Sequence, residues 1–145
     1  MRKVIYQTIA SALADVSNIK HIDLWQQQTN LAEEEQPFAT PAVFVEFDSI
    51  DWRQHLHGVR EASVSITLHI VTDSRVGHWS DTVQVFDLID RIAARLHGLH
   101  TTTPDGSVMD ALTLERSTTD HNFDELQDNQ ETYACHITDR SAYAI

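Results

Sequence analysis

Residues 60–72 read REASVSITLHIVT, and polar and apolar side chains alternate along them. Even-numbered positions from Ala62 to Ile70 are apolar, and odd-numbered positions from Glu61 to His69 are polar. Because successive side chains of a strand point to opposite faces, this pattern predicts a long strand with one buried and one wet face. A helix would scatter the same apolar residues around its circumference. We therefore expect a central strand with which the rest of the chain pairs, or whose apolar face it covers.

The composition is typical of a single acidic globular domain. The chain has 145 residues, of which 41% are hydrophobic, and we expect one domain with one core over residues 1–145. There are 22 acidic residues against 10 lysines and arginines, which gives a formal charge of −12. Such a surface repels phosphate backbones, so tight sequence-independent binding of DNA is disfavoured. DNA could still pass close to the protein without being held.

Cysteine content and the start of the chain bear on its compartment. The single cysteine, Cys135, allows no intrachain disulfide and gives no sign of an oxidising compartment. The first residues, MRKVIYQT, include basic side chains but no sustained apolar run follows them, so they do not resemble a signal peptide. No apolar stretch approaches the roughly 20 residues that span a bilayer. We expect a soluble protein made in the cytoplasm.

Two segments have helical periodicity. Apolar residues from Val4 to Val16 recur at helical spacing and predict an amphipathic helix that ends near residues 17–18. A second apolar stripe between residues 85 and 96 predicts a helix with Ser80 as its N-cap and Gly98 as its C′ residue.

Further strands are predicted at residues 19–25, 42–48, 108–117 and 131–142, the first of them at a sheet edge. Residues 26–41 carry Gln and Glu triplets and two prolines, which predicts a loop. Residues 49–58 are expected to connect the strand at 42–48 to the central strand or to extend it, residues 101–106 to form a turn, and residues 120–130 to form a surface connection. The order is therefore α-β-β-β-α-β-β. Short connections favour a mostly antiparallel sheet with two helices packed on one face, which is an α+β fold.

Catalytic machinery is not evident in the sequence. Phosphate-binding and dinucleotide-binding glycine motifs and the Gly-x-Ser-x-Gly motif are absent. His55 and His57 would share one face of a strand, where Asp48 or Asp51 could complete a metal site, but we favour a polar connection. We therefore predict no catalytic, cofactor or metal residue. The alternative is a small metal-dependent or acid–base enzyme that uses His55, His57 or His121.

Two further residues have a simple structural interpretation. Cys135 shares its strand parity with apolar neighbours, which predicts a buried, inert thiol. His69 lies on the polar side of the central strand, where we expect it to face solvent or a neighbouring subunit rather than to take part in catalysis.

The last third of the chain is strongly acidic. From residue 100 onward nine acidic side chains accompany only two arginines. A solvated surface is the simplest interpretation. In a ring-forming protein these acids could instead line a negative channel or contact the basic side chains of a neighbour, namely Arg2, Lys3, Arg91 and Arg95. The sequence leaves these alternatives open.

The order of elements resembles that of the tail terminator, or tail completion, proteins of tailed bacteriophages and prophages. The likeness is carried by an N-terminal amphipathic helix, the Pro-led strand PAVFV at 41–45, the strand SITLHIVTD at 65–73, a polar loop, the helix at 83–96 and two closing strands. Residues 66–96 carry most of it, and the element order covers nearly the whole chain.

This resemblance implies a non-enzymatic structural protein without a cofactor. Such proteins form a homo-oligomeric ring, often a hexamer, that caps the tail tube, stops its polymerisation and docks to the head connector. DNA would slide through an acidic lumen without specific binding. The protein would be assembled in the host cytoplasm and then reside in the virion tail.

On this reading, the polar side of the central strand is the candidate oligomer or lumen face: Glu61, Ser63, Ser65, Thr67 and His69. The Gln-rich and Glu-rich loop containing Glu33, Glu34 and Glu35 is the candidate for a mobile loop that orders on assembly. This loop and the acidic link at 120–130 depart from the family pattern. They leave open a related role, that of a head–tail connector or neck protein.

Overall fold

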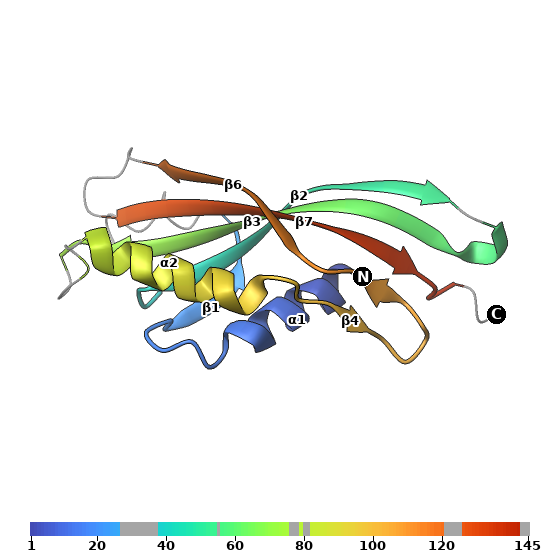
Figure 1. Cartoon of the computed structure of the whole chain (residues 1–145), viewed down its shortest axis with the longest axis horizontal. Coiled ribbons are helices and arrows are strands. Elements are labelled where there is room, and N and C mark those ends of the chain that lie inside the picture. The colour runs from blue at the N-terminus through green and yellow to red at the C-terminus, as the bar shows by residue number, and fades with distance from the viewer. Residues whose placement is uncertain (27–37, 55, 76–78, 80–81, 121–125, 143–145) are drawn as a thin grey trace.

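The computed structural model describes residues 1–26, 38–54, 56–75, 79, 82–120 and 126–142. All strands belong to one sheet in the order β1-β2-β3-β7-β5-β4, and β6 also pairs with β7. Both helices lie on one face of this sheet (Figure 1). In chain order the elements are α1 (Arg2–Leu13), β1 (His21–Leu24), β2 (Ala42–Gln54), the 3-10 turn η2 (Leu56–Gly58), β3 (Arg60–Asp73), α2 (Thr82–Leu96), β4 (Thr101–Thr102), β5 (Val108–Met109), β6 (Thr113–Asp120) and β7 (Leu126–Asp139). The predicted α+β class, with a mostly antiparallel sheet and two helices on one face, is confirmed.

The central strand is β3, as the alternation of residues 60–72 predicts. It pairs in antiparallel fashion with β2 on one side and with β7 on the other. Its even-numbered side chains are at most 2% exposed and form the middle of the core: Ala62, Val64, Ile66, Leu68 and Ile70. Full burial of a large aliphatic side chain stabilises a fold by about 1.5–3 kcal/mol, so this row is a major source of stability.

The helices cover this row with their own apolar stripes. α1 buries Ile5, Ile9 and Leu13, which are spaced four residues apart, and α2 buries Val85, Leu88, Ile92 and Leu96. α1 ends at Leu13, earlier than predicted, because the chain turns there while Val16 still reaches the core. After α2, Gly98 adopts the predicted left-handed conformation, with φ of +72°. Ser80, the predicted N-cap, lies outside the described residues.

β2 is longer than the strand predicted at residues 42–48. It runs to Gln54, so of the two predicted roles of residues 49–54, connection or extension of the strand, the structure shows the extension. A β-bulge between Phe47 and Ser49 inserts one extra residue. Odd-numbered apolar side chains face the helices before the bulge, and even-numbered ones such as Ile50 face them after it. This shift is one reason why apolar residues fall on both parities in this segment.

The acidic end of the chain contains more strand than predicted. The segment 108–117 divides into β5 and β6, and the predicted turn at 101–106 contains β4. β7 begins at Leu126, so the second half of the expected surface connection at 120–130 is wrong as a loop. Asp128 and Asn129 are only 2% and 3% exposed. The polar composition of this segment suggested a surface loop, but Asp128 and Asn129 are buried because they hydrogen-bond with His69 of β3 and Thr119 of β6.

β1 is an edge strand, as predicted, but it pairs with β2 in parallel. In the part of the chain that the structure describes, no helix is both long and apolar enough to cross a membrane.

Candidate assembly face

The side chains of interest lie on the face of the sheet opposite the helices, here called the second face. The odd-numbered side chains of β3 point there, alongside Phe44 and Glu46 of β2 and Asp128 and Thr132 of β7, which are their register partners. The second face is divided along its length. One half is closed by packing within the chain, and the other half is open to solvent.

The closed half is centred on His69, which is 3% exposed. Its Nδ1 lies 2.9 Å from Oδ2 of Asp128, and its Nε2 lies 2.7 Å from Oε1 of Glu46. The ring of Trp25 stacks on the imidazole with a centroid distance of 3.7 Å and an interplanar angle of 2°. His69 therefore joins three strands of the sheet and holds the residue that follows β1.

The hydrogen-bond partners of His69 bear on the protonation state of its imidazole. An ionised carboxylate only accepts hydrogen bonds, so two carboxylate partners require both ring nitrogens to donate a proton. Burial opposes the charged ring and would lower the pKa of His69, but hydrogen bonding to Asp128 and Glu46 outweighs burial and raises this pKa above its ordinary value. Both carboxylate neighbours thus favour the protonated, imidazolium form of this buried ring.

Apolar side chains complete the closed half. Phe38, Ala42, Phe44, Val71 and Leu126 form a small second cluster, on which Trp25 packs. The rings of Phe38 and Phe44 meet edge to face at 5.0 Å. The hydrogen bond between His69 and Asp128 is buried beside this cluster, which strengthens it, whereas the bond to Glu46 is only partly buried.

Thr67 marks the boundary between the two halves. It is 5% exposed, and its hydroxyl lies 2.6 Å from Oδ2 of Asp48 and 3.0 Å from Oγ1 of Thr132. Ser65, which is half-buried, also donates to Asp48, at 3.3 Å. Asp48 itself is exposed and occupies the bulge of β2.

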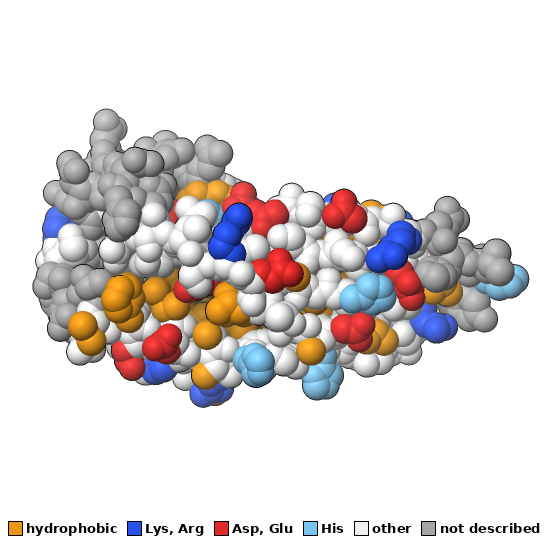
Figure 2. All heavy atoms as spheres, turned by 45° about the horizontal axis from the view of Figure 1, so that its top comes forward, with side chains coloured by type: hydrophobic (Ala, Val, Ile, Leu, Met, Phe, Trp, Pro, Cys, Tyr) orange, Lys and Arg blue, Asp and Glu red, His pale blue; other side chains and the backbone are white. Residues whose placement is uncertain are grey.

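The open half lies beyond Ser65 and is polar and mainly acidic. Ser63, Asp51 and Arg53 are exposed, and Glu61 is half-buried, 3.7 Å from His136. No apolar ring covers this end among the described residues of the second face. Figure 2 shows acidic and basic side chains interspersed over the surface on this side of the molecule.

The prediction for the polar side of β3 is therefore partly wrong. Thr67 and His69 do not face solvent or a neighbour, because Trp25, Phe44 and the carboxylates of adjacent strands surround them. Glu61, Ser63 and Ser65 do lie on the open half. Their role as an oligomer or lumen face remains a prediction.

Only some of the other candidate residues lie in the part of the chain that the structure describes. His57 is exposed in η2, with φ of 63°, whereas His55, His121 and the Glu33–Glu35 triplet lie outside the described residues. Cys135 is buried as predicted, and burial raises the pKa of its thiol to about 11. Among the described residues, no group of three or more His, Cys, Asp or Glu side chains is arranged to hold a metal ion.

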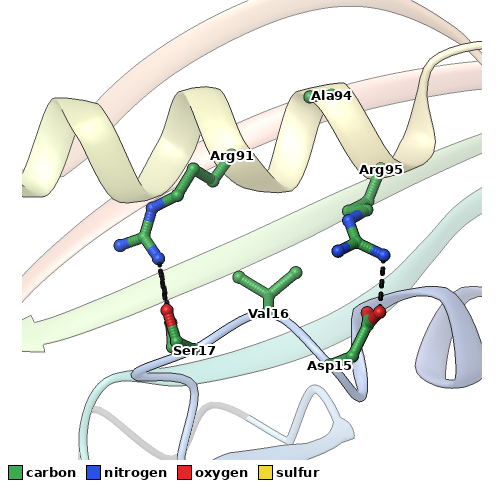
Figure 3. A pocket seen from close by; sticks show the side chains of 6 residues that line it. All are labelled: Asp15, Val16, Ser17, Arg91, Ala94 and Arg95. Atoms are coloured by element: carbon green, nitrogen blue, oxygen red, sulfur yellow. Dashed lines mark hydrogen bonds and ion pairs between the residues drawn. The ribbon is translucent and has the colours of Figure 1, made fainter.

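A hollow between α2 and the turn after α1 is lined by Arg91 and Arg95, two of the basic residues that were considered as contacts for a neighbouring subunit (Figure 3). Arg91 donates to Oγ of Ser17 at 2.8 Å, and Arg95 donates to Oδ2 of Asp15 at 2.7 Å. Both arginines thus brace α2 against α1 within the chain. Of the basic side chains considered as contacts for a neighbour, Arg2 and Lys3 stay exposed at the start of α1.

Sequence reasoning missed the partners of His69. Parity placed His69 on the polar side of its strand, but Glu46 and Asp128 are 23 and 59 residues away. Only the register of β2 and β7 against β3 brings them into contact. The available signal was the mixture of acidic and apolar residues in 42–48, which suits a strand partly covered on both faces.

Comparison with known proteins gives little further information. No family model and no curated protein matches the sequence. One similar solved chain comes from a structure described as "Virion of native gene transfer agent (GTA) particle", with 10% identity, coverage of 93% of this chain and 92% of that chain, and a TM-score of 0.48. Values of this size establish neither a shared family nor a shared function.

Proposed function

We propose that this chain is a non-enzymatic assembly protein of a phage-type tail, which acts as a homo-oligomeric ring of the tail terminator kind. The observation that supports it best is the open half of the second face. Long paired strands there present hydroxyls, the exposed carboxylates of Asp48 and Asp51, and the half-buried Glu61 beside the exposed Arg53. The surface is extended and acidic, which suits contact with other proteins or the lining of a channel.

An acidic lumen has a clear physical purpose in such a ring. DNA carries one negative charge per ~1.7 Å of its axis, so basic side chains on a channel wall would hold it and carboxylates would not. The open half supplies carboxylates on a rigid sheet rather than on loops. The element order, which resembles that of tail terminators, supports the same proposal.

The test is the length of tails made in cells that lack this protein. We expect overlong, headless tails by electron microscopy, and normal tails when the wild-type chain is supplied. A double variant, Ser63→Lys with Ser65→Lys, places two cations on the open half and should fail to restore infectivity. Ser11→Lys on the exposed side of α1 is the control and should restore it.

Other outcomes separate the alternatives. Tails of normal length that fail to join heads would favour a head–tail connector or neck protein. A strict monomer that retains stoichiometric zinc or manganese and is dispensable for tail length would overturn the proposal and favour the metal-dependent enzyme.

A further inference from the structure

A groove of about 260 Å³ lies between α2 and β6, on the helix side of the sheet. Its lining comes from three elements and includes Phe86 and Asp90 of α2, Ser117 and Thr119 of β6, and Asn129 and Glu131 of β7. Asn129 and Glu131 are in register with Ile70 and Leu68 of β3, so their side chains point to the face that the helices cover. The groove therefore has a polar floor beneath a partly apolar rim.

The side-chain amide of Asn129 has an unused donor on this floor. The residue is 3% exposed, and its Oδ1 accepts a hydrogen bond from Thr119 at 2.8 Å. Its Nδ2 has no hydrogen-bond partner among the described residues. Because a buried donor without an acceptor is unfavourable, an acceptor that enters the groove from the helix side would be stabilised there.

Glu131 supplies the complementary acceptor. Its side chain is buried and accepts a hydrogen bond from Ser117. Burial raises the pKa of Glu131 more than this hydrogen bond lowers it, and the nearby Asp90 raises it further. A carboxylate has about four lone-pair sites, so Glu131 has capacity for a further donor. That donor would also offset the unfavourable burial of the carboxylate.

The spacing of the two groups suits a single planar ligand group. Residues two apart on one strand face are separated by about 6.6–6.8 Å. A carboxamide with one hydrogen bond of about 2.9 Å at each of its two polar atoms spans a similar distance. One such group can therefore contact Asn129 with its oxygen and Glu131 with its nitrogen.

The same chemistry excludes simpler ligands. A lysine or arginine side chain would satisfy the carboxylates but would bring further donors to Nδ2 of Asn129. A lone carbonyl would satisfy Nδ2 but would bring no donor to Glu131. A carboxamide supplies both, and it would still pair with Asn129 if the amide of Asn129 were rotated by 180°.

Exposed side chains form the rim and control entry. Phe86 is 54% exposed, and Figure 2 shows hydrophobic side chains gathered over this part of the molecule. Such a rim suits the methylene groups of a long side chain. Nδ2 of Asn129 is closed to solvent, but Phe86 and Thr119 are both exposed, and exposed side chains change rotamer within nanoseconds. A ligand enters when one of them turns aside.

We propose that this groove binds the carboxamide of a glutamine side chain that a partner protein inserts between α2 and β6. The oxygen of that carboxamide accepts from Nδ2 of Asn129, its nitrogen donates to Glu131, and its methylene groups pack on Phe86. Glutamine suits the site better than asparagine, because its longer side chain reaches past the rim to the floor. The proposal does not depend on the ring assembly, and either can hold without the other.

An NMR titration of the isotope-labelled full chain tests the site with a defined probe, Nα-acetylglutamine N-methylamide. We expect saturable shifts of the side-chain NH₂ signals of Asn129, with a dissociation constant on the order of 1 mM, which is typical of a ligand of this size. These signals are assigned by their loss in Asn129→Asp. Nα-acetylmethionine N-methylamide has a side chain of similar length without the carboxamide and should bind at least about fivefold more weakly.

Variants locate the binding. Asn129→Asp keeps the shape of the side chain but replaces the donor by an acceptor, and should weaken binding of the glutamine probe by about tenfold or more. Phe86→Ala changes only the exposed rim and should weaken it by about threefold, because the methylene groups lose their apolar contact. Gln84→Ala is the control, since Gln84 is exposed on the opposite side of α2, and should change binding by less than about twofold.

Three outcomes would overturn the proposal. They are a titration that leaves the side-chain signals of Asn129 unmoved, equal binding of the glutamine and methionine probes, and equal binding of the glutamine probe to the wild type and to Asn129→Asp. The ring proposal is judged separately by tail length. Overlong tails in the absence of the chain would uphold it even if the groove binds no carboxamide.

Discussion

The two faces of β3 differ in how they are covered. The helix face is a continuous apolar row that two amphipathic helices bury along its length. On the second face the odd-numbered side chains of β3 from Glu61 to His69 are polar, yet the His69 end is as buried as the core and the Ser63 end is wet. The comparison shows that a polar side chain reveals which face it lies on, but not whether other parts of the chain cover it.

The largest loss of stability is expected for a substitution on the helix face. Ile66→Ala removes a side chain that is 0% exposed and should lower the free energy of unfolding by about 2–5 kcal/mol, measured by urea denaturation. Ser63→Ala on the open half should change it by less than about 0.5 kcal/mol. Equal losses in the two variants would mean that the open half is covered in solution.

A smaller loss is expected at the closed half of the second face. Asp128→Asn keeps the shape of the side chain but removes the charge that neutralises His69, and should cost about 1–3 kcal/mol. Asp51→Asn is the matched control, because Asp51 is exposed on the open half. If both substitutions are neutral, the buried ion pair does not contribute to stability.

The closed half should also be sensitive to alkaline pH. Because the pKa of His69 is raised in the folded protein, its stabilising contribution is complete below about pH 6.5, the ordinary histidine value. That contribution is lost as pH rises through the raised folded-state pKa. We expect the stability difference between wild type and His69→Gln to shrink as pH increases. A difference that grows with pH would contradict a buried imidazolium.

The smallest effect is expected for the ring stack on His69. Trp25→Leu keeps an apolar side chain but removes the stacked ring, which should cost about 0.5–2 kcal/mol at neutral pH, as for cation–π contacts. Trp25→Leu should also lower the pH above which His69 loses its proton, measured by NMR of the imidazole. An unchanged titration would show that the carboxylates alone hold the charge.

Much of the fold was predictable from local patterns. The period of two over residues 60–72 and the helical stripes of the two helices identified β3, α1 and α2 and their buried sides. Strand ends were less predictable, because the bulge near Phe47 and the buried polar start of β7 depend on pairing with other strands.

The candidate site was predictable only in part. Strand parity placed Ser63, Ser65, Thr67 and His69 together on one face. The burial of Thr67 and His69 was not predictable, because it depends on Trp25 and on carboxylates that the sheet brings together from β2 and β7.

The sequence by itself thus determined the central strand, its apolar side and the helices that cover it, because each of these follows from side-chain spacing within one segment. Only the tertiary structure decided which polar residues are buried. Register and strand order set the distance between His69 and its carboxylates, and no local pattern encodes that distance. Among the described residues, the same register leaves the Ser63 end of the second face exposed.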